Sequence, residues 1–203
     1  MYLPALKQNP HARVHAVAGR NPKRTRVFSE RWVIPRYYDQ AETLIEEAKI
    51  NALIVATDNR THCPLTMKAF ESGLNVLCEN TLGLNYQEAT RMQEAARFKD
   101  FTNMVPFAYS FMTSARYPKE LIEDGFLGRP YHLNMRYYGG GERKPGYHWR
   151  FDSRKGGTGA MGDIGSHFLY IARWLFGEVI QVCCQLDRLI EQPERDPKRE
   201  NYP

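Results

Sequence analysis

The residues best suited to chemistry are an aspartate and a histidine four positions apart, Asp163 and His167. On a helix this spacing puts both side chains on one face. Histidine exchanges protons near neutral pH, and a neighbouring carboxylate orients its ring. The pair indicates general acid–base catalysis, although a structural His–Asp pair is the more common result of this spacing. A metal would need further ligands, and nothing fixes the position of His148, a conceivable further ligand, so no metal is predicted.

Two arginines follow a segment, residues 12–18, that alternates polar and apolar side chains and predicts a strand. In a dinucleotide-binding domain an acidic residue at this strand end binds the ribose 2′-hydroxyl, whereas arginine accommodates a 2′-phosphate. Arg20 lies at this end and Arg24 begins the next predicted helix, so both guanidinium groups can converge on one phosphate. Two solvated surface arginines are the alternative.

Short polar side chains also follow the next two predicted strands, as Thr57-Asp58-Asn59 and Glu79-Asn80. Ligands of parallel sheets bind outside the carboxyl ends of the strands, so these residues are candidates for binding a polar cofactor ring. Helix caps and turns are the alternative. The sequence Gly157-x-Gly159-x-x-Gly162 matches a dinucleotide fingerprint, but no apolar strand precedes it, so a glycine-rich turn before a helix is expected.

The elements that position these residues alternate between strand and helix in the first half of the chain. Short connections in such an order predict a parallel sheet covered by helices on both faces. We expect strands at 12–18, 52–56 and 74–78, and helices at 21–32, 39–48, 61–72 and 85–98.

After residue 101 the pattern changes, which places a domain boundary near Asn103 and predicts domains at 1–103 and 104–203. The alternation of 131–138 is typical of a strand. The second half is expected to contain strands at 104–109, 131–138 and 179–186, helices at 117–124 and 163–176, a loop at 139–159 and a polar tail at 191–203.

The composition is that of an ordinary globular protein, with 203 residues, of which 42% are hydrophobic and 25% charged. The net charge of +5 is spread among acidic residues, so nucleic-acid binding is not predicted. We see no apolar run of roughly 20 residues and no secretory signal, and therefore predict no membrane association. The four cysteines form no C-x-x-C motif, so they are expected to be reduced, mostly buried thiols of a cytoplasmic protein.

Four segments together resemble the Gfo/Idh/MocA oxidoreductases. Residues 56–62, Ala-Thr-Asp-Asn-Arg-Thr-His, are similar to the A-T-x-N-x-x-H segment of that family, and residues 76–81, Val-Leu-Cys-Glu-Asn-Thr, stand where V-L-C-E-K-P is expected. Residues 149–152, Trp-Arg-Phe-Asp, and the block 156–167 resemble W-R-F-D and G-G-G-x-x-x-D-x-G-x-H. This last block is the most specific, and it favours a functional role for Asp163 and His167.

The resemblance implies an α/β protein with an incomplete Rossmann-type parallel sheet, followed by part of a second α/β domain with an open, mostly antiparallel sheet. It implies an NAD(P)-dependent oxidoreductase of a sugar, polyol or related substrate, a homo-oligomer if full length, with hydride transfer and His167 as proton relay. Asp163 would orient the substrate or the histidine. The implied catalytic positions are His167, Asp163 and Asn80, and the implied NADP- or NAD-binding positions are Arg20, Arg24, Thr57, Asn59, His62, Glu79, Trp149 and Arg150.

Three departures from the family pattern leave two alternatives open. The lysine of E-K-P is Asn80, which forms hydrogen bonds but cannot accept and release a proton as lysine does, and the proline is Thr81. The first strand with its glycine loop and the last part of the second domain are also expected to be missing. The alternatives are a non-catalytic NADP-binding or regulatory homologue, and an inactive fragment.

Overall fold

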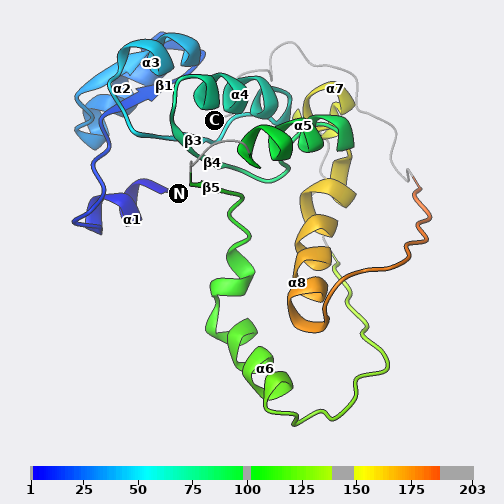
Figure 1. The fold of residues 1–203 in the computed structure, drawn as a ribbon. Helices are drawn as coiled ribbons and strands as arrows, with labels where there is room; N and C mark the ends of the chain where they lie inside the picture. The colour runs from blue at the N-terminus through cyan, green and yellow to red at the C-terminus, as the bar shows by residue number, and fades with distance from the viewer. Residues whose placement is uncertain (1, 98–101, 139–148, 188–203) are drawn as a thin grey trace. The chain divides into compact units, whose positions relative to one another are not determined.

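The structure is a computed structural model that describes residues 2–97, 102–138 and 149–187 (Figure 1). The chain divides into two compact units. Unit 1 comprises Met1–Thr57, Thr61–Glu79 and Gln87–Met104, and unit 2 comprises Asp58–Arg60, Asn80–Tyr86 and Val105–Pro203. The boundary therefore runs through the turns that follow two strands as well as through the residues after 104.

Unit 1 is an α/β structure in which all strand pairs are parallel. Strand β1 (Ala16–Ala18) pairs with β2 (Arg36–Tyr38), and β4 (Asn75–Cys78) lies between β3 (Ala52–Val55) and β5 (Asn103–Met104). The strands form a two-stranded and a three-stranded ladder. This confirms the predicted parallel, Rossmann-like architecture, although β2 was not predicted from the sequence.

Capping residues mark the ends of two helices of unit 1. In α2 (Pro22–Trp32) the Asn21 side chain accepts a hydrogen bond from the Arg24 amide at 3.1 Å, and proline occupies the first helical position. Helix α4 (His62–Glu71) is followed by Gly73 at φ 77°, a conformation that glycine adopts without strain. The other helices of this unit are α1 (Tyr2–Gln8), α3 (Ala41–Glu47) and α5 (Tyr86–Arg97), whose first residue belongs to unit 2.

The hydrophobic core lies in unit 1. Helices α2 and α3 contact β1 and β2, α4 contacts β3 and β4, and α3 also packs against α4 (Figure 1). Every apolar side chain that is buried in the described ranges belongs to this unit. Burial of Phe70, Leu44 and Val55, each below 5% exposure, stabilises the ladder that presents Thr57 and Glu79.

Unit 2 is mainly helical where it is described. Its longest helices are α6 (Thr113–Glu123) and α8 (Ser166–Phe176), which end at Gly125 and Gly177, both with positive φ. Its shorter elements are the 3₁₀ turns η1 (Asn59–Thr61), η2 (Ala108–Phe111) and η4 (Trp149–Phe151), the one-turn helix α7 (Ser153–Gly156) and the π-helical turn η5 (Met161–Gly165). The last residue of η1, Thr61, belongs to unit 1.

Several sequence predictions are wrong. The segments 131–138 and 179–186 form no strands, because alternation creates a strand only when a neighbouring strand accepts its backbone hydrogen bonds, and the described residues offer none. The strand expected at 104–109 stops at Met104, since Pro106 has no amide to donate. Helix α6 starts at Thr113 rather than at residue 117, and η4 and α7 occupy part of the predicted loop.

Some boundaries shift by fewer residues. Strand β1 contains only the three residues that pair with β2. Helix α3 starts two residues after Asp39, so Gln40 rather than Asp39 occupies the N-cap position, and the Gln40 side chain makes no capping hydrogen bond. The tail 191–203 and most of the glycine-rich loop, 139–148, lie outside the described residues.

The cysteine prediction holds in part. All four thiols are free, but only Cys63 and Cys78 are buried, whereas Cys183 and Cys184 are exposed. Within the described ranges no three metal-binding side chains come together, and no helix combines the length and the hydropathy that crossing a bilayer requires.

Candidate active site

Two candidate catalytic residues of unit 2, Asp163 and His167, lie on and after the π-helical turn η5, which leads directly into α8. Asp163 is within this turn, and its Oδ2 lies 3.1 Å from Arg150 Nε. The Arg150 guanidinium also lies over the ring of Trp149, 4.4 Å from its centroid. Three residues that the sequence singled out, Asp163, Arg150 and Trp149, are therefore brought together.

His167 occupies an aromatic environment on the first turn of α8. The rings of Phe107 and Tyr109 meet the imidazole edge-on, with centroids at 5.2 and 5.1 Å. Its Nδ1 atom is buried and makes no hydrogen bond to any residue in the described part of the chain. An unbonded buried ring nitrogen is costly in a folded protein, and active sites are where such costs are retained.

Asp163 and His167 do not form the hydrogen-bonded pair that their spacing indicated. The carboxylate pairs with Arg150, and no hydrogen bond joins it to the imidazole in the described residues. The π-helical turn explains the difference, because its wider turn changes the angular relation that holds between positions four apart on an α-helix.

Asn80 bridges two residues of the same region. Its Nδ2 donates to the Asp163 backbone carbonyl at 2.9 Å, and its Oδ1 accepts from the Ser166 hydroxyl at 3.0 Å. Asn80 is thus hydrogen-bonded to the candidate catalytic aspartate and to the residue that precedes His167. Ser166 was missed from the sequence, because its role depends on a partner 86 positions away.

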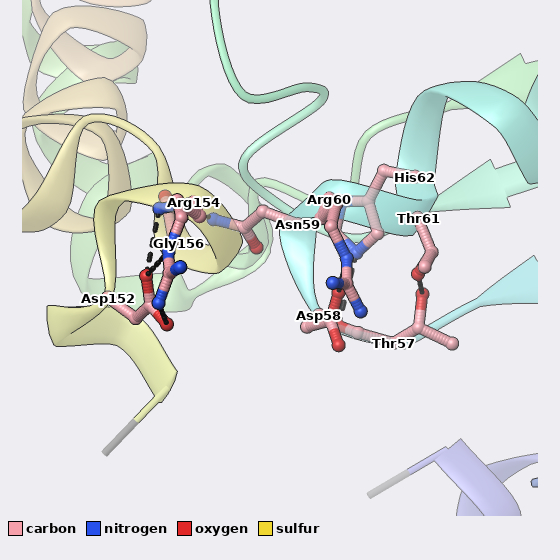
Figure 2. Close-up of polar contacts among 9 residues, drawn as sticks. All are labelled: Thr57, Asp58, Asn59, Arg60, Thr61, His62, Asp152, Arg154 and Gly156. Carbon is pink, nitrogen blue, oxygen red and sulfur yellow. Dashed lines mark hydrogen bonds and ion pairs between the residues drawn. The ribbon is translucent and has the colours of Figure 1, made fainter. Parts of the chain in front are cut away.

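A second set of contacts anchors α7 (Figure 2). The buried Asp152 caps this helix through the Arg154 amide and also holds the Arg154 guanidinium, with Oδ1 to Nε at 3.1 Å. Asn59, which is 3% exposed, donates from Nδ2 to the Gly156 carbonyl at 2.9 Å. The W-R-F-D segment and the turn around Asn59 therefore stabilise each other within unit 2, with Asp58 beside Arg60 at 3.7 Å.

The polar residues after β3 that belong to unit 1 form a compact turn (Figure 2). The Thr61 hydroxyl donates to Thr57 Oγ1 at 2.6 Å, and the His62 Nε2 lies 3.2 Å from the Thr57 carbonyl oxygen. Thr57 is exposed, whereas His62 has no exposed surface. The buried His62 side chain therefore packs against the end of β3, whereas Thr57 is exposed to solvent.

Glu79, at the end of β4, accepts a hydrogen bond from the Tyr2 hydroxyl of α1. Burial and this contact with Glu79 both raise the pKa of Tyr2, which therefore stays protonated as a donor. Burial raises the pKa of the neighbouring Cys78 to about 12, so this thiol is uncharged at neutral pH and is no nucleophile. Tyr2 was not identified from the sequence, because nothing local to it signals a distant carboxylate.

The two arginines after β1 remain candidates for binding a phosphate. Arg20 and Arg24 are both exposed, and the intervening Asn21 caps α2. The turn is tight, because a side chain at Gly19 would place its Cβ 2.6 Å from Thr25 Oγ1. No acidic residue stands between Gly19 and Arg26.

Unit 1 has a parallel α/β ladder with polar side chains at its strand ends, which is typical of a dinucleotide-binding domain, and unit 2 holds the His–Asp region. A family profile described as "Oxidoreductase family, NAD-binding Rossmann fold" matches residues 1–107, and the "GFO/IDH/MocA C-terminal domain" matches residues 115–200. The chain belongs to the GFO/IDH/MocA family of oxidoreductases.

Curated relatives and solved structures agree with this assignment. Levoglucosan dehydrogenase of Pseudarthrobacter phenanthrenivorans is 29% identical over 181 residues, covering 88% of this chain and 46% of the relative. Myo-inositol 2-dehydrogenase of Thermotoga maritima is 26% identical over 176 residues, covering 87% of this chain and 51% of the relative. A structure of levoglucosan dehydrogenase in complex with NADH and levoglucosan superposes with a TM-score of 0.76 at 26% identity, covering 87% of this chain and 49% of that one. The chain spans about half the length of these relatives.

Proposed function

We propose that this chain is part of an NAD(P)-dependent dehydrogenase or reductase that acts on a sugar, polyol or related hydroxyl or carbonyl compound. The observation that carries the proposal is His167: its ring contacts two aromatic side chains, and its buried Nδ1 has no hydrogen bond in the described residues, in a chain of an oxidoreductase family. His167 would take the proton from the substrate hydroxyl during oxidation and return it during reduction.

The residues of unit 1 fit a nicotinamide dinucleotide at its adenosine end. Two exposed arginines and no carboxylate follow β1, which suits a 2′-phosphate better than a free 2′-hydroxyl. Thr57 and Glu79 follow β3 and β4, where a polar ring would find hydrogen-bonding groups. When bound, the cofactor supplies the hydride acceptor or donor. In unit 2, Arg150 would fix the Asp163 carboxylate so that its free oxygen can receive a substrate hydroxyl, with Trp149 stacked on the guanidinium.

The proposal extends to domain organisation, assembly and location. The division into 1–103 and 104–203 would separate cofactor binding from substrate binding, and the second half would contribute to an open antiparallel sheet and to a homo-oligomer. Four free cysteines are compatible with a reducing, cytoplasmic location.

The proposed function is tested by titrating the protein with NADPH and NADH, followed by fluorescence, and by assaying turnover with a panel that includes levoglucosan, myo-inositol and aldoses. Saturable binding with turnover of at least one of these compounds supports the proposal. Failure of both cofactors to bind would overturn it.

A second candidate is a non-catalytic NADP-binding homologue. The observation that favours it is Asn80, whose amide cannot act as a general acid or base near neutral pH and is hydrogen-bonded to Asp163 and Ser166. Tight NADPH binding without turnover of any compound in the panel would select this candidate, and measurable turnover by the unaltered protein would exclude it.

The arginine pair gives a specific prediction about cofactor choice. In the double variant R20A/R24A, the affinity for NADPH is expected to fall about tenfold, since two charge-assisted contacts to a 2′-phosphate are lost at an exposed and screened position. The affinity for NADH is expected to change less than about twofold, because it has no such phosphate. R31A, an exposed arginine in the last turn of α2, is the matched control and should change neither. Equal losses for both cofactors would contradict the assignment.

A further inference from the structure

We propose that Asn80 is a positioning residue whose amide, together with Ser166, holds the π-helical turn η5 and so fixes the orientation of Asp163 and His167. The structural part of this inference stands on hydrogen bonds within unit 2, and its consequence for catalysis rests on the proposed function. The amide donates to Asp163 O and accepts from Ser166 Oγ, so it uses both of its functional groups on the turn.

The two bonds act at the point where the helix changes its winding. Asp163 lies within η5, and Ser166 is the first residue of α8. A π-helical turn before an α-helix shifts the register of backbone hydrogen bonds, and side chains are one source of partners for the carbonyls affected. Because His167 directly follows Ser166, a side chain that fixes Ser166 also fixes the start of the helix that carries the imidazole.

The segment that begins with Asn80 packs closely against the glycine-rich segment that leads into η5. A Cβ on Gly162 would lie 2.9 Å from Thr81 Cγ2, and a Cβ on Gly157 would lie 2.7 Å from the Leu84 carbonyl oxygen. The chain around residues 80–84 therefore runs directly against the glycine-rich segment 157–162. Asn80 supplies the polar link across this contact, and the glycines allow the close approach.

The chemistry of the pair explains why asparagine suits this position. The bridge needs a donor for a carbonyl and an acceptor for a hydroxyl at the same side-chain end, and an amide offers both. A lysine offers donors only, so it would leave the Ser166 hydroxyl without its acceptor. We therefore expect that N80K alone does not convert the site into that of a lysine-containing relative, and that residues 80 and 166 depend on each other.

The test is a double-mutant cycle on the 203-residue chain with N80A, S166A and N80A/S166A, without cofactor. The readouts are the ring-proton chemical shifts of His167, which the edge-on rings of Phe107 and Tyr109 displace, and amide hydrogen exchange at residues 161–167. The matched control is N75A in unit 1, because the Asn75 amide likewise donates to a carbonyl, that of Asn51, and accepts from a donor, the Thr102 amide, both at 2.8 Å.

We expect N80A to reduce the displacement of the His167 shifts and to accelerate exchange at residues 161–167 about tenfold. S166A, which deletes only a hydroxyl and keeps the chain folded, should change both readouts in the same direction. The double variant should go no further than N80A, because the two residues share one interaction. N75A should change neither. Unchanged His167 shifts in S166A, additive effects in the cycle, or equal effects from N75A would overturn the inference.

Activity measurements separate this inference from the proposed function. If the protein turns over a sugar, N80A should lower kcat about tenfold while KM and cofactor affinity stay within about twofold, because the amide aligns groups rather than binding ligands. A KM effect without a kcat effect would overturn the positioning role. If the unaltered protein turns over nothing, the proposed function fails, and the cycle on His167 still decides whether Asn80 positions the turn.

Discussion

Replacing His167 with asparagine is expected to lower kcat about a thousandfold, with NADPH affinity within about twofold of the unaltered protein. Proton transfer by a positioned side chain contributes about 10²–10⁴ in rate, and an asparagine amide hydrogen-bonds without exchanging a proton. The cofactor affinity should survive because the candidate residues for the adenosine end, Arg20 and Arg24, belong to unit 1. Steady-state kinetics with the best sugar of the panel and a fluorescence titration measure the two effects.

The control for this variant is His132→Asn, since His132 is an exposed histidine of the same unit. H132N should keep full activity. The aromatic contacts of His167 with Phe107 and Tyr109 contribute to packing, so H167N is also expected to unfold at a temperature a few degrees lower. Activity within tenfold of the unaltered protein, measured below the unfolding transition, would rule out His167 as the proton relay.

Local signals in the sequence predicted most of unit 1. Asn21-Pro22 and Gly73 mark helix ends through chemistry that acts over one turn, and the apolar runs of β3 and β4 mark strands that pair with each other. Strand β2 was not predicted, because it has only three residues, two of them exposed, and follows a proline. Three residues are too few to show the alternation of polar and apolar side chains. The segments 131–138 and 179–186 failed for the opposite reason, since a clear alternation was present without a strand to pair with.

The candidate site was predictable as a set of residues and not as a set of contacts. The spacing of Asp163 and His167 placed them in one region, but the partner of the carboxylate is Arg150, and the partner of Asn80 is Ser166, 86 positions away. The π-helical turn could not be predicted either, because it leaves the apolar pattern of α8 unchanged and alters only the side-chain directions of the residues that precede α8. Pairings of this kind are set by packing between distant segments, which periodicity does not encode.

The glycine-rich segment makes a prediction of a different kind: Gly157→Ala should destabilise unit 2 by about 3 kcal/mol. Gly157 has φ 72°, which costs an L-residue about 1 kcal/mol or more, and an added Cβ would lie 2.7 Å from the backbone oxygen of Leu84. Because backbone atoms give way less readily than a flexible side chain, the clash adds a further cost of about 1–3 kcal/mol. Urea unfolding measured by tryptophan fluorescence reports this change, since Trp149 and Trp174 both belong to unit 2.

Gly159 is the matched control, since it shares the positive φ, 60°, but has no atom within 4 Å of an added Cβ. G159A should therefore cost only the conformational term, about 1 kcal/mol. The two variants also separate packing from nucleotide binding: if the G-x-G-x-x-G of residues 157–162 cradled a pyrophosphate, both would weaken NADPH binding. We expect both to leave the NADPH affinity of the folded protein unchanged, because Gly157 allows the close approach of Leu84 and Gly159 supplies only a positive φ. Equal destabilisation by the two variants would contradict this explanation. A loss of NADPH affinity in both variants would instead indicate that the glycine motif binds the cofactor.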